Sequence, residues 1–164
     1  KKLITGFGPN RNYTCTYPDV FKANAFIGNY LRVEILSRYG LKIQLLKEVN
    51  DYFYRMTQLT GTLWEMMDSG SSCNHGFASW LGHILYRDAL GINHIDYIGK
   101  EVTIRFSDND VDDCSGVIPV DESYIELKWK RSDNQIMYSV KVPPGYKVNV
   151  ENESSSELVR STVL

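Results

Sequence analysis

One carboxylate stands among large apolar side chains in the segment TGTLWEMMDSGSSCNHG, residues 60–76. Glu65 is flanked by Trp64 and Met66, and glycines bound this apolar cluster on both sides. A carboxylate that aromatic side chains partly desolvate accepts a proton more readily, which suits acid–base catalysis near neutral pH. An exposed position in a turn is the more common explanation for a single Glu, and the local sequence leaves both interpretations open.

Asn74 and His75 follow Glu65 after about ten positions, where a further helix is predicted to begin. Polar groups at the open end of a helix can converge on a ligand, although a His beside a helix start more often caps or packs. Cys73 and His75 are not a thiol–imidazole pair, because residues two apart on a helix point in different directions and no orienting third group is evident.

The remaining metal-ligand residue types do not form a site with suitable spacing. Residues 107–113 place carboxylates at alternate positions, but Asp113 stands where a calcium loop needs Gly and Pro119 where it needs Glu. A solvated acidic turn is the better interpretation. His83 and His94 lack metal-ligand spacing, and the three cysteines are widely spaced and odd in number. We therefore expect no metal, no cofactor and no disulfide framework.

The first part of the chain has helical periodicity. Apolar residues recur three and four positions apart over residues 19–39, 41–60 and 74–91, and a Gly lies at or just beyond the end of each stretch. We expect Asp19 to cap the first helix, and Asn74 or a neighbouring Ser to cap the third. Almost nothing links the first two helices, which predicts an antiparallel hairpin. The apolar stripe of the first helix comprises Ala23, Ile27, Tyr30, Leu31 and Ile35.

After Ile92 the hydrophobic period falls to two, which predicts strands. The alternation covers residues 102–106, 125–130 and 136–142, with a further short strand at 148–150. An antiparallel sheet with one solvent-facing side, most simply half of a β-sandwich, explains this pattern. The last residues, 151–164, are predicted to be a tail or an edge strand. The fold class is therefore α+β, with antiparallel helices in a domain at 1–92 and a small antiparallel β-sandwich at 93–164.

Composition narrows the class of protein. The 164 residues are 43% hydrophobic and 23% charged, with a formal net charge of −2, and no basic face recommends nucleic acid or an anionic membrane. No run of eighteen apolar residues predicts a membrane span.

The chain begins at Lys1 without an initiator Met, so we expect a fragment whose targeting segment lies elsewhere, and the compartment stays open. The helices have wide apolar faces, which predicts that they are the end of a larger helical array. We expect these faces to bind the rest of the array or a second copy of the chain.

Three motifs carry a family likeness: GTLWE, then CNHGFAS, then LYRDALGI directly before the β-region. Together with the upstream segment FGPNRNYTCTYPDVFKANAFIGNYLRVEILSRYG, they resemble the C-terminal part of a bacterial α-L-rhamnosidase of glycoside hydrolase family 78. The likeness runs from Phe7 to about Val150. It implies the last helices of an (α/α)6 catalytic barrel followed by that family's C-terminal β-sandwich.

The resemblance implies inverting hydrolysis of terminal α-L-rhamnosides, from glycosides or polysaccharides that contain rhamnose. One carboxylic acid protonates the leaving oxygen, and a second carboxylate activates water on the opposite face of the ring. The general base of the family falls on Glu65, and the His that contacts the sugar hydroxyls falls on His75. Trp64 and Asn74 are expected to shape the pocket as neighbours.

Two departures from the family pattern matter. The connection between Glu65 and His75 is shorter than in many members, so the cover over the sugar is expected to differ. The general acid belongs to an upstream segment that this sequence lacks, so we expect the chain alone to be inactive or nearly so and its partner to be the upstream remainder of the barrel. The alternative is a non-catalytic carbohydrate-binding or scaffolding module.

Overall fold

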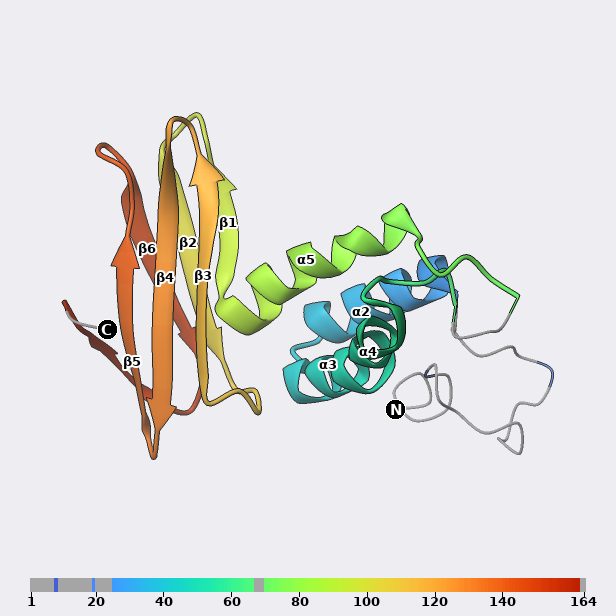
Figure 1. The fold of residues 1–164 in the computed structure, drawn as a ribbon. Helices are drawn as coiled ribbons and strands as arrows, with labels where there is room; N and C mark the ends of the chain where they lie inside the picture. The colour runs from blue at the N-terminus through green and yellow to red at the C-terminus, as the bar shows by residue number, and fades with distance from the viewer. Residues whose placement is uncertain (1–7, 9–18, 20–24, 67–69, 163–164) are drawn as a thin grey trace. The chain divides into compact units, whose positions relative to one another are not determined.

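The computed structural model describes Gly8, Asp19 and residues 25–66 and 70–162 (Figure 1). These residues form two compact units, one ending at Gly82 and the other beginning at His83. Asp19, the predicted cap of the first helix, lies in a turn, and most of the predicted N-terminal loop lies outside the described residues. No helix within the described ranges is long and apolar enough to cross a membrane.

The helical unit has the three helical stretches that the periodicity predicts. The first is α2 (Phe26–Arg38), and its N-cap is Ala25, so the predicted cap at Asp19 is wrong. The second runs through three consecutive elements, α3 (Lys42–Glu48), η1 (Val49–Tyr54) and α4 (Arg55–Thr60). The third begins with η2 (Gly76–Ser79), continues as α5 (Trp80–Ile84) and is followed along the chain by η3 (Leu85–Leu90), which belongs to the other unit. Gly61, with φ at +74°, ends the second stretch in the left-handed conformation that Gly adopts without strain.

An ion pair holds α2 and α3 together. Arg32 donates to both carboxylate oxygens of Glu48, from Nε at 2.7 Å and from Nη2 at 2.6 Å. Arg32 lies seven residues before Tyr39 and Glu48 seven after Leu41, so their contact requires the chain to fold back at the short connection. The predicted hairpin is therefore confirmed. The bidentate geometry and the low exposure of both side chains make this pair a specific constraint on the register of the two helices.

The apolar stripe of α2 is largely exposed in this chain. Ile27 is 60% and Leu31 55% accessible, whereas the opposite face buries Asn29 and Arg32 beside Val33 and Leu36. Helix α2 is apolar around much of its circumference, and only one of its sides has neighbours within the described residues. The buried hydrophobic residues of the helical unit are Val33, Leu36, Leu45, Val49, Tyr52, Phe53, Met56, Ala78 and Leu81.

The second unit is a two-sheet β-structure, and the α+β class is confirmed. One sheet has the order β1 (Ile92–Asp96), β2 (Glu101–Ser107) and β6 (Lys147–Glu153). The other has the order β3 (Asp113–Val120), β4 (Ser123–Ser132), β5 (Gln135–Lys141) and β7 (Glu157–Arg160). The prediction of wholly antiparallel sheets needs a correction, because β2 pairs with β6 and β5 with β7 in parallel. Alternation shows which side of a strand is buried but carries no strand direction.

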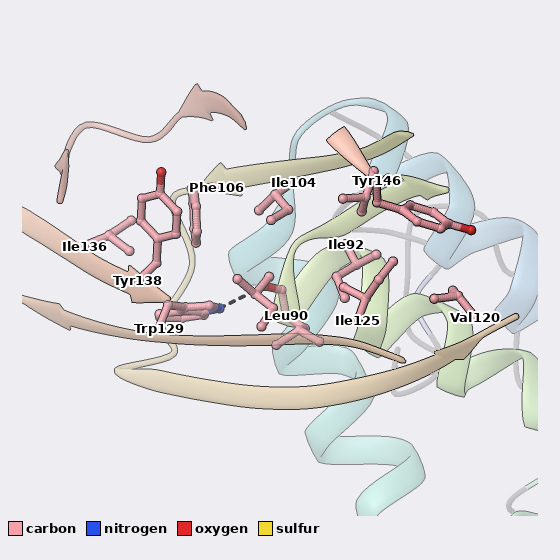
Figure 2. Packing of buried hydrophobic residues seen from close by; sticks show 12 residues of the cluster. Leu90, Ile92, Ile104, Phe106, Val120, Ile125, Trp129, Ile136, Tyr138 and Tyr146 are labelled. Carbon is pink, nitrogen blue, oxygen red and sulfur yellow. Dashed lines mark hydrogen bonds between the residues drawn. The ribbon is translucent and has the colours of Figure 1, made fainter. Parts of the chain in front are cut away.

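The two sheets face each other across one hydrophobic core, shown in Figure 2. Helix η3 contributes Leu90 to this core, and the indole Nε1 of Trp129 donates to the Leu90 carbonyl oxygen at 2.9 Å. Gly116 on β3 admits this helix, because a Cβ atom there would lie 2.6 Å from a Leu90 methyl carbon. Strand β7 stands at the edge of its sheet, in the place predicted for a tail or an edge strand.

Candidate functional site

The segment that carries Glu65 is held by backbone hydrogen bonds on both of its sides. The Glu65 amide donates to the Ser72 carbonyl oxygen at 2.9 Å, and the Phe26 amide donates to the Glu65 carbonyl oxygen at 2.9 Å. An isolated antiparallel bridge joins Ala25 to Met66. Glu65 therefore lies between the start of α2 and the returning loop, which fixes the position of its backbone. The side chain of Glu65 is partly exposed.

The same pairing brings the His75 region to Glu65. The His75 amide donates to the Leu63 carbonyl oxygen at 2.8 Å, and the Thr62 hydroxyl donates to the Cys73 carbonyl oxygen. Residues 62–66 and 71–75 are thus two arms of one loop, with residues 67–69 outside the described part. The structure brings together, through their backbones, the two positions that the sequence singles out for chemistry.

The His75 imidazole packs in an aromatic cluster. Its ring centroid lies 4.6 Å from that of Phe26 on α2 and 5.6 Å from that of Phe77 on η2. The ring atom Nε2 is buried and has no hydrogen-bond partner among the described residues. An imidazole nitrogen can donate or accept, so this atom can bind a hydroxyl group in either sense.

The predicted cap of the third helix is wrong. His75, not Asn74 or a Ser, precedes η2, and no side chain makes a capping hydrogen bond there. The Asn74 carbonyl oxygen instead accepts a hydrogen bond from the Ser72 hydroxyl at 3.2 Å, within the loop. A tight 3-10 turn at the helix start leaves fewer free amide groups for a cap to satisfy.

Trp64 and Asn74, the two expected neighbours of the site, differ in their surroundings. The indole Nε1 of Trp64 donates to the Thr60 hydroxyl at 2.7 Å, and its backbone amide contacts the Met56 sulfur at 3.4 Å. Asn74 is exposed. The structure thus assigns Trp64 a local structural contact, and the sugar-binding roles of both residues stay predictions.

The acidic run at residues 107–113 includes the connection between β2 and β3. Asp108 accepts hydrogen bonds from the amide and the hydroxyl of Ser155 and forms an ion pair with Arg131. Its carboxylate therefore joins two loops of the β-unit. No group of three His, Cys, Asp or Glu side chains within the described ranges is arranged to hold a metal ion. Cys73 and Cys114 are free thiols, and Cys15 lies outside the described residues.

Sequence reasoning missed Phe26, which lies beside the candidate site, and two buried nitrogen atoms elsewhere in the helical unit. Phe26 contacts both the Glu65 backbone and the His75 ring, yet it lies some forty residues away in the sequence, where nothing singled it out within the upstream segment. Asn29 and Trp80 each have a buried nitrogen atom without a partner among the described residues. A signal existed for Asn29, since a polar residue inside an otherwise apolar helix needs an explanation.

Comparison with known proteins gives a structural likeness and no sequence match. No protein-family model matches the sequence, and no curated protein matches it. The crystal structure of a GH78 family rhamnosidase of Bacillus sp. GL1 superposes with a TM-score of 0.72 at 21% sequence identity. The alignment covers 84% of this chain and 16% of the rhamnosidase chain. At this identity the likeness shows a shared fold, and the present chain spans a small part of that protein's length.

Proposed function

We propose that this chain is the C-terminal part of an inverting α-L-rhamnosidase of the family 78 type, with Glu65 as the base that activates water. The structural likeness to a GH78 family rhamnosidase over 84% of the chain carries this proposal. In it, residues 1–92 supply the last helices of the catalytic barrel and residues 93–164 its C-terminal β-sandwich domain. The substrates are rhamnose-containing glycosides or polysaccharides.

The local geometry supports the assignment to Glu65. Backbone hydrogen bonds on both sides hold this residue, and a catalytic group needs such support to keep its position relative to the substrate. His75, His75's aromatic neighbours and Glu65 come together around the start of α2. Imidazole and aromatic rings suit a deoxy sugar, because the rings cover its apolar face while the nitrogen binds a hydroxyl group.

The exposed apolar residues of the helical unit support the proposal that the chain works within a longer protein. Ile27, Leu31, Tyr39, Tyr54 and Leu59 are all more than half exposed. Leaving so much apolar surface in water forgoes the hydrophobic stabilisation that a neighbouring helix would supply. The upstream remainder of the barrel would cover this surface and bring the general acid that the inverting mechanism requires.

The test is hydrolysis of an aryl α-L-rhamnoside by the longer protein that contains this chain, with the chain alone as comparison. Glu65→Gln keeps the shape of the side chain but removes the base, so kcat is expected to fall by about 10²-fold or more, as for loss of general base catalysis. Glu34→Gln, on α2, is the matched control and should leave kcat within a few-fold. Turnover of Glu65→Gln within a few-fold of wild type would refute the assignment.

A non-catalytic carbohydrate-binding module is the second candidate, favoured by the imidazole Nε2 of His75, which has no hydrogen-bond partner among the described residues. In that case the longer protein has no hydrolase activity while L-rhamnose still binds. Calorimetric titration of L-rhamnose into the chain, with and without His75→Ala, separates sugar binding from a purely structural role of this residue.

A further inference from the structure

A pocket of about 320 Å³ lies on the four-stranded sheet of the β-unit and includes no residue of the helical unit. Strands β4, β5 and β7 line it, together with the residues that follow β7. The pocket forms at a step in the sheet, because β7 pairs only with residues 135–138 of β5, whereas β5 continues to Lys141. The Ser161 amide donates to the Tyr138 carbonyl oxygen at 2.7 Å, which holds the chain after β7 beside β5.

Positive charge predominates in this pocket. Its ionisable side chains are the cations Lys128, Lys141 and Arg160 and the single carboxylate of Glu126, an excess of two positive charges. The whole chain has a formal net charge of −2, so the overall composition does not explain this excess. Like charges gathered in a concave site repel one another and attract an anion.

Glu126 orders the two lysines without neutralising the pocket. The Lys128 Nζ lies 2.9 Å from one Glu126 carboxylate oxygen, and the Lys141 Nζ lies 3.9 Å from the other. A hydrogen bond from Lys128, assisted by the charges of both lysines, holds the pKa of Glu126 below its ordinary value. Glu126 is therefore ionised at neutral pH, and its one charge cannot compensate both lysines.

Arg160, the last residue of β7, differs from the other arginines of the β-unit. Arg87, Arg105 and Arg131 each form an ion pair with a carboxylate. Arg160 is exposed and makes no hydrogen bond or ion pair with any residue that the structure describes. A guanidinium group presents a planar fork of donors that matches two oxygens of a carboxylate or a phosphate. The Arg160 guanidinium is thus a cation that lacks an anion at the pocket wall.

We propose that this pocket binds an acidic sugar through the carboxylate or phosphate group of that sugar, with Arg160 and Lys141 as the cations that contact the anion. The hydroxyl groups of Ser139 and Thr162, which also line the pocket, can exchange hydrogen bonds with sugar hydroxyls. The volume of about 320 Å³ is at the lower end of small-molecule sites, so it admits one sugar unit. This site lies within the β-unit and does not depend on a catalytic role of Glu65.

The direct measurement is a titration of the isotopically labelled chain, followed through its backbone amide resonances by nuclear magnetic resonance. The ligands are D-glucuronate, D-glucose 6-phosphate and, as the neutral comparison, D-glucose. We expect the amides of residues 139–141 and 160–162 to shift saturably with at least one of the two acids and not with D-glucose. The acid that binds more tightly identifies the anionic group, and added salt should weaken its binding.

Three variants test the charges individually. Arg160→Gln should weaken binding of the acid by about tenfold or more, the scale of a lost charge-assisted hydrogen bond. Lys130→Gln is the matched control, because Lys130 lies on the same side of β4 as Lys128 but outside the pocket, and it should leave the affinity within about twofold, since exposed charges at a distance are screened. Glu126→Gln removes the one negative charge and should strengthen binding by about threefold, the scale of a like charge a few ångströms away in water.

Several results would overturn the proposal. Neither acid might shift these amides saturably, or D-glucose might shift them equally. Equal weakening by Arg160→Gln and Lys130→Gln would show that the ligand responds to net charge and not to this pocket. Weaker binding by Glu126→Gln would contradict its electrostatic basis. Arg160 is exposed on an edge strand, so the spectrum of Arg160→Gln should match that of the wild type away from the pocket, and Lys141→Gln provides the same test from β5.

Discussion

Trp129→Phe tests whether the indole–carbonyl hydrogen bond fastens helix η3 to the β-core. In the structure, Nε1 of Trp129 donates to the Leu90 carbonyl oxygen at 2.9 Å, and Trp129 is 3% exposed. The Phe ring keeps an aromatic side chain at this position but has no donor. The Leu90 carbonyl oxygen would then lose its hydrogen bond to Trp129. The aromatic ring at position 129 would still shield this oxygen from water.

The expected loss has two parts. Leaving a buried carbonyl oxygen without its donor costs about 1–3 kcal/mol. Shrinking a buried ring adds roughly 1 kcal/mol, the scale of a small truncation in a core. Together they predict that the free energy of unfolding of the β-unit falls by about 2–4 kcal/mol, enough to lower its melting temperature by roughly 10 °C or more.

The assay is urea unfolding of the chain, followed by nuclear magnetic resonance signals from the β-unit, because two units need not unfold in one transition. Trp64→Phe is the matched control. It removes an indole bond to the exposed Thr60 hydroxyl, which water can replace, so the β-unit signals should be unaffected. Equal β-unit midpoints for Trp129→Phe and Trp64→Phe would show that the buried bond contributes nothing to this unit.

Two further predictions concern the β-unit. Gly116→Ala places a Cβ atom 2.6 Å from a Leu90 methyl carbon, so overpacking should lower the free energy of unfolding by about 1–3 kcal/mol. Gly82→Ala is the control, because a Cβ atom there meets nothing within 4 Å, and it should not destabilise the chain. Thermal unfolding of both variants tests this difference. A hydrogen bond from Lys100 holds the pKa of Asp121 below its ordinary value. The ionised Asp121 carboxylate therefore stabilises the folded chain at pH values above the ordinary carboxyl pKa. This stabilisation is lost as the pH falls through the pKa of Asp121 in the folded state. Melting temperatures of wild type and Asp121→Asn should accordingly differ at pH 7 and converge in acid, and a difference that does not depend on pH would contradict this.

The β-region could be predicted from sequence because alternation encodes burial directly. Val102, Ile104 and Phe106 alternate with polar residues, and all three are buried in the core. The parallel pairings of β6 and β7 could not be predicted in the same way. Which strand lies next to which depends on contacts between segments far apart in the chain, such as Glu101 with Lys147.

The candidate site could likewise be predicted only in part from the local sequence. Glu65 and His75 could be found because their residue types are unusual within a local pattern. The contacts of Phe26 with His75 and of Tyr30 with Trp80 depend on how α2 packs against residues 75–80, which no local pattern encodes. The helix cap at Asn74 was wrong for a related reason, because the loop pairing uses the backbone there and η2 begins one residue later.

The exposure pattern of helix α2 supports its place in a longer protein. In a complete domain, an amphipathic helix turns its apolar stripe toward the core. Helix α2 instead exposes Ile27 and Leu31 and buries Asn29 and Arg32. Arg32 is explained by its ion pair with Glu48, which orders the hairpin. Asn29 has no such explanation within the described residues. Covering Ile27 and Leu31 would stabilise α2 by removing apolar surface from water. The Arg32 ion pair and the exposed apolar stripe therefore serve different neighbours of the same helix, one within this chain and one expected from the rest of the helical array.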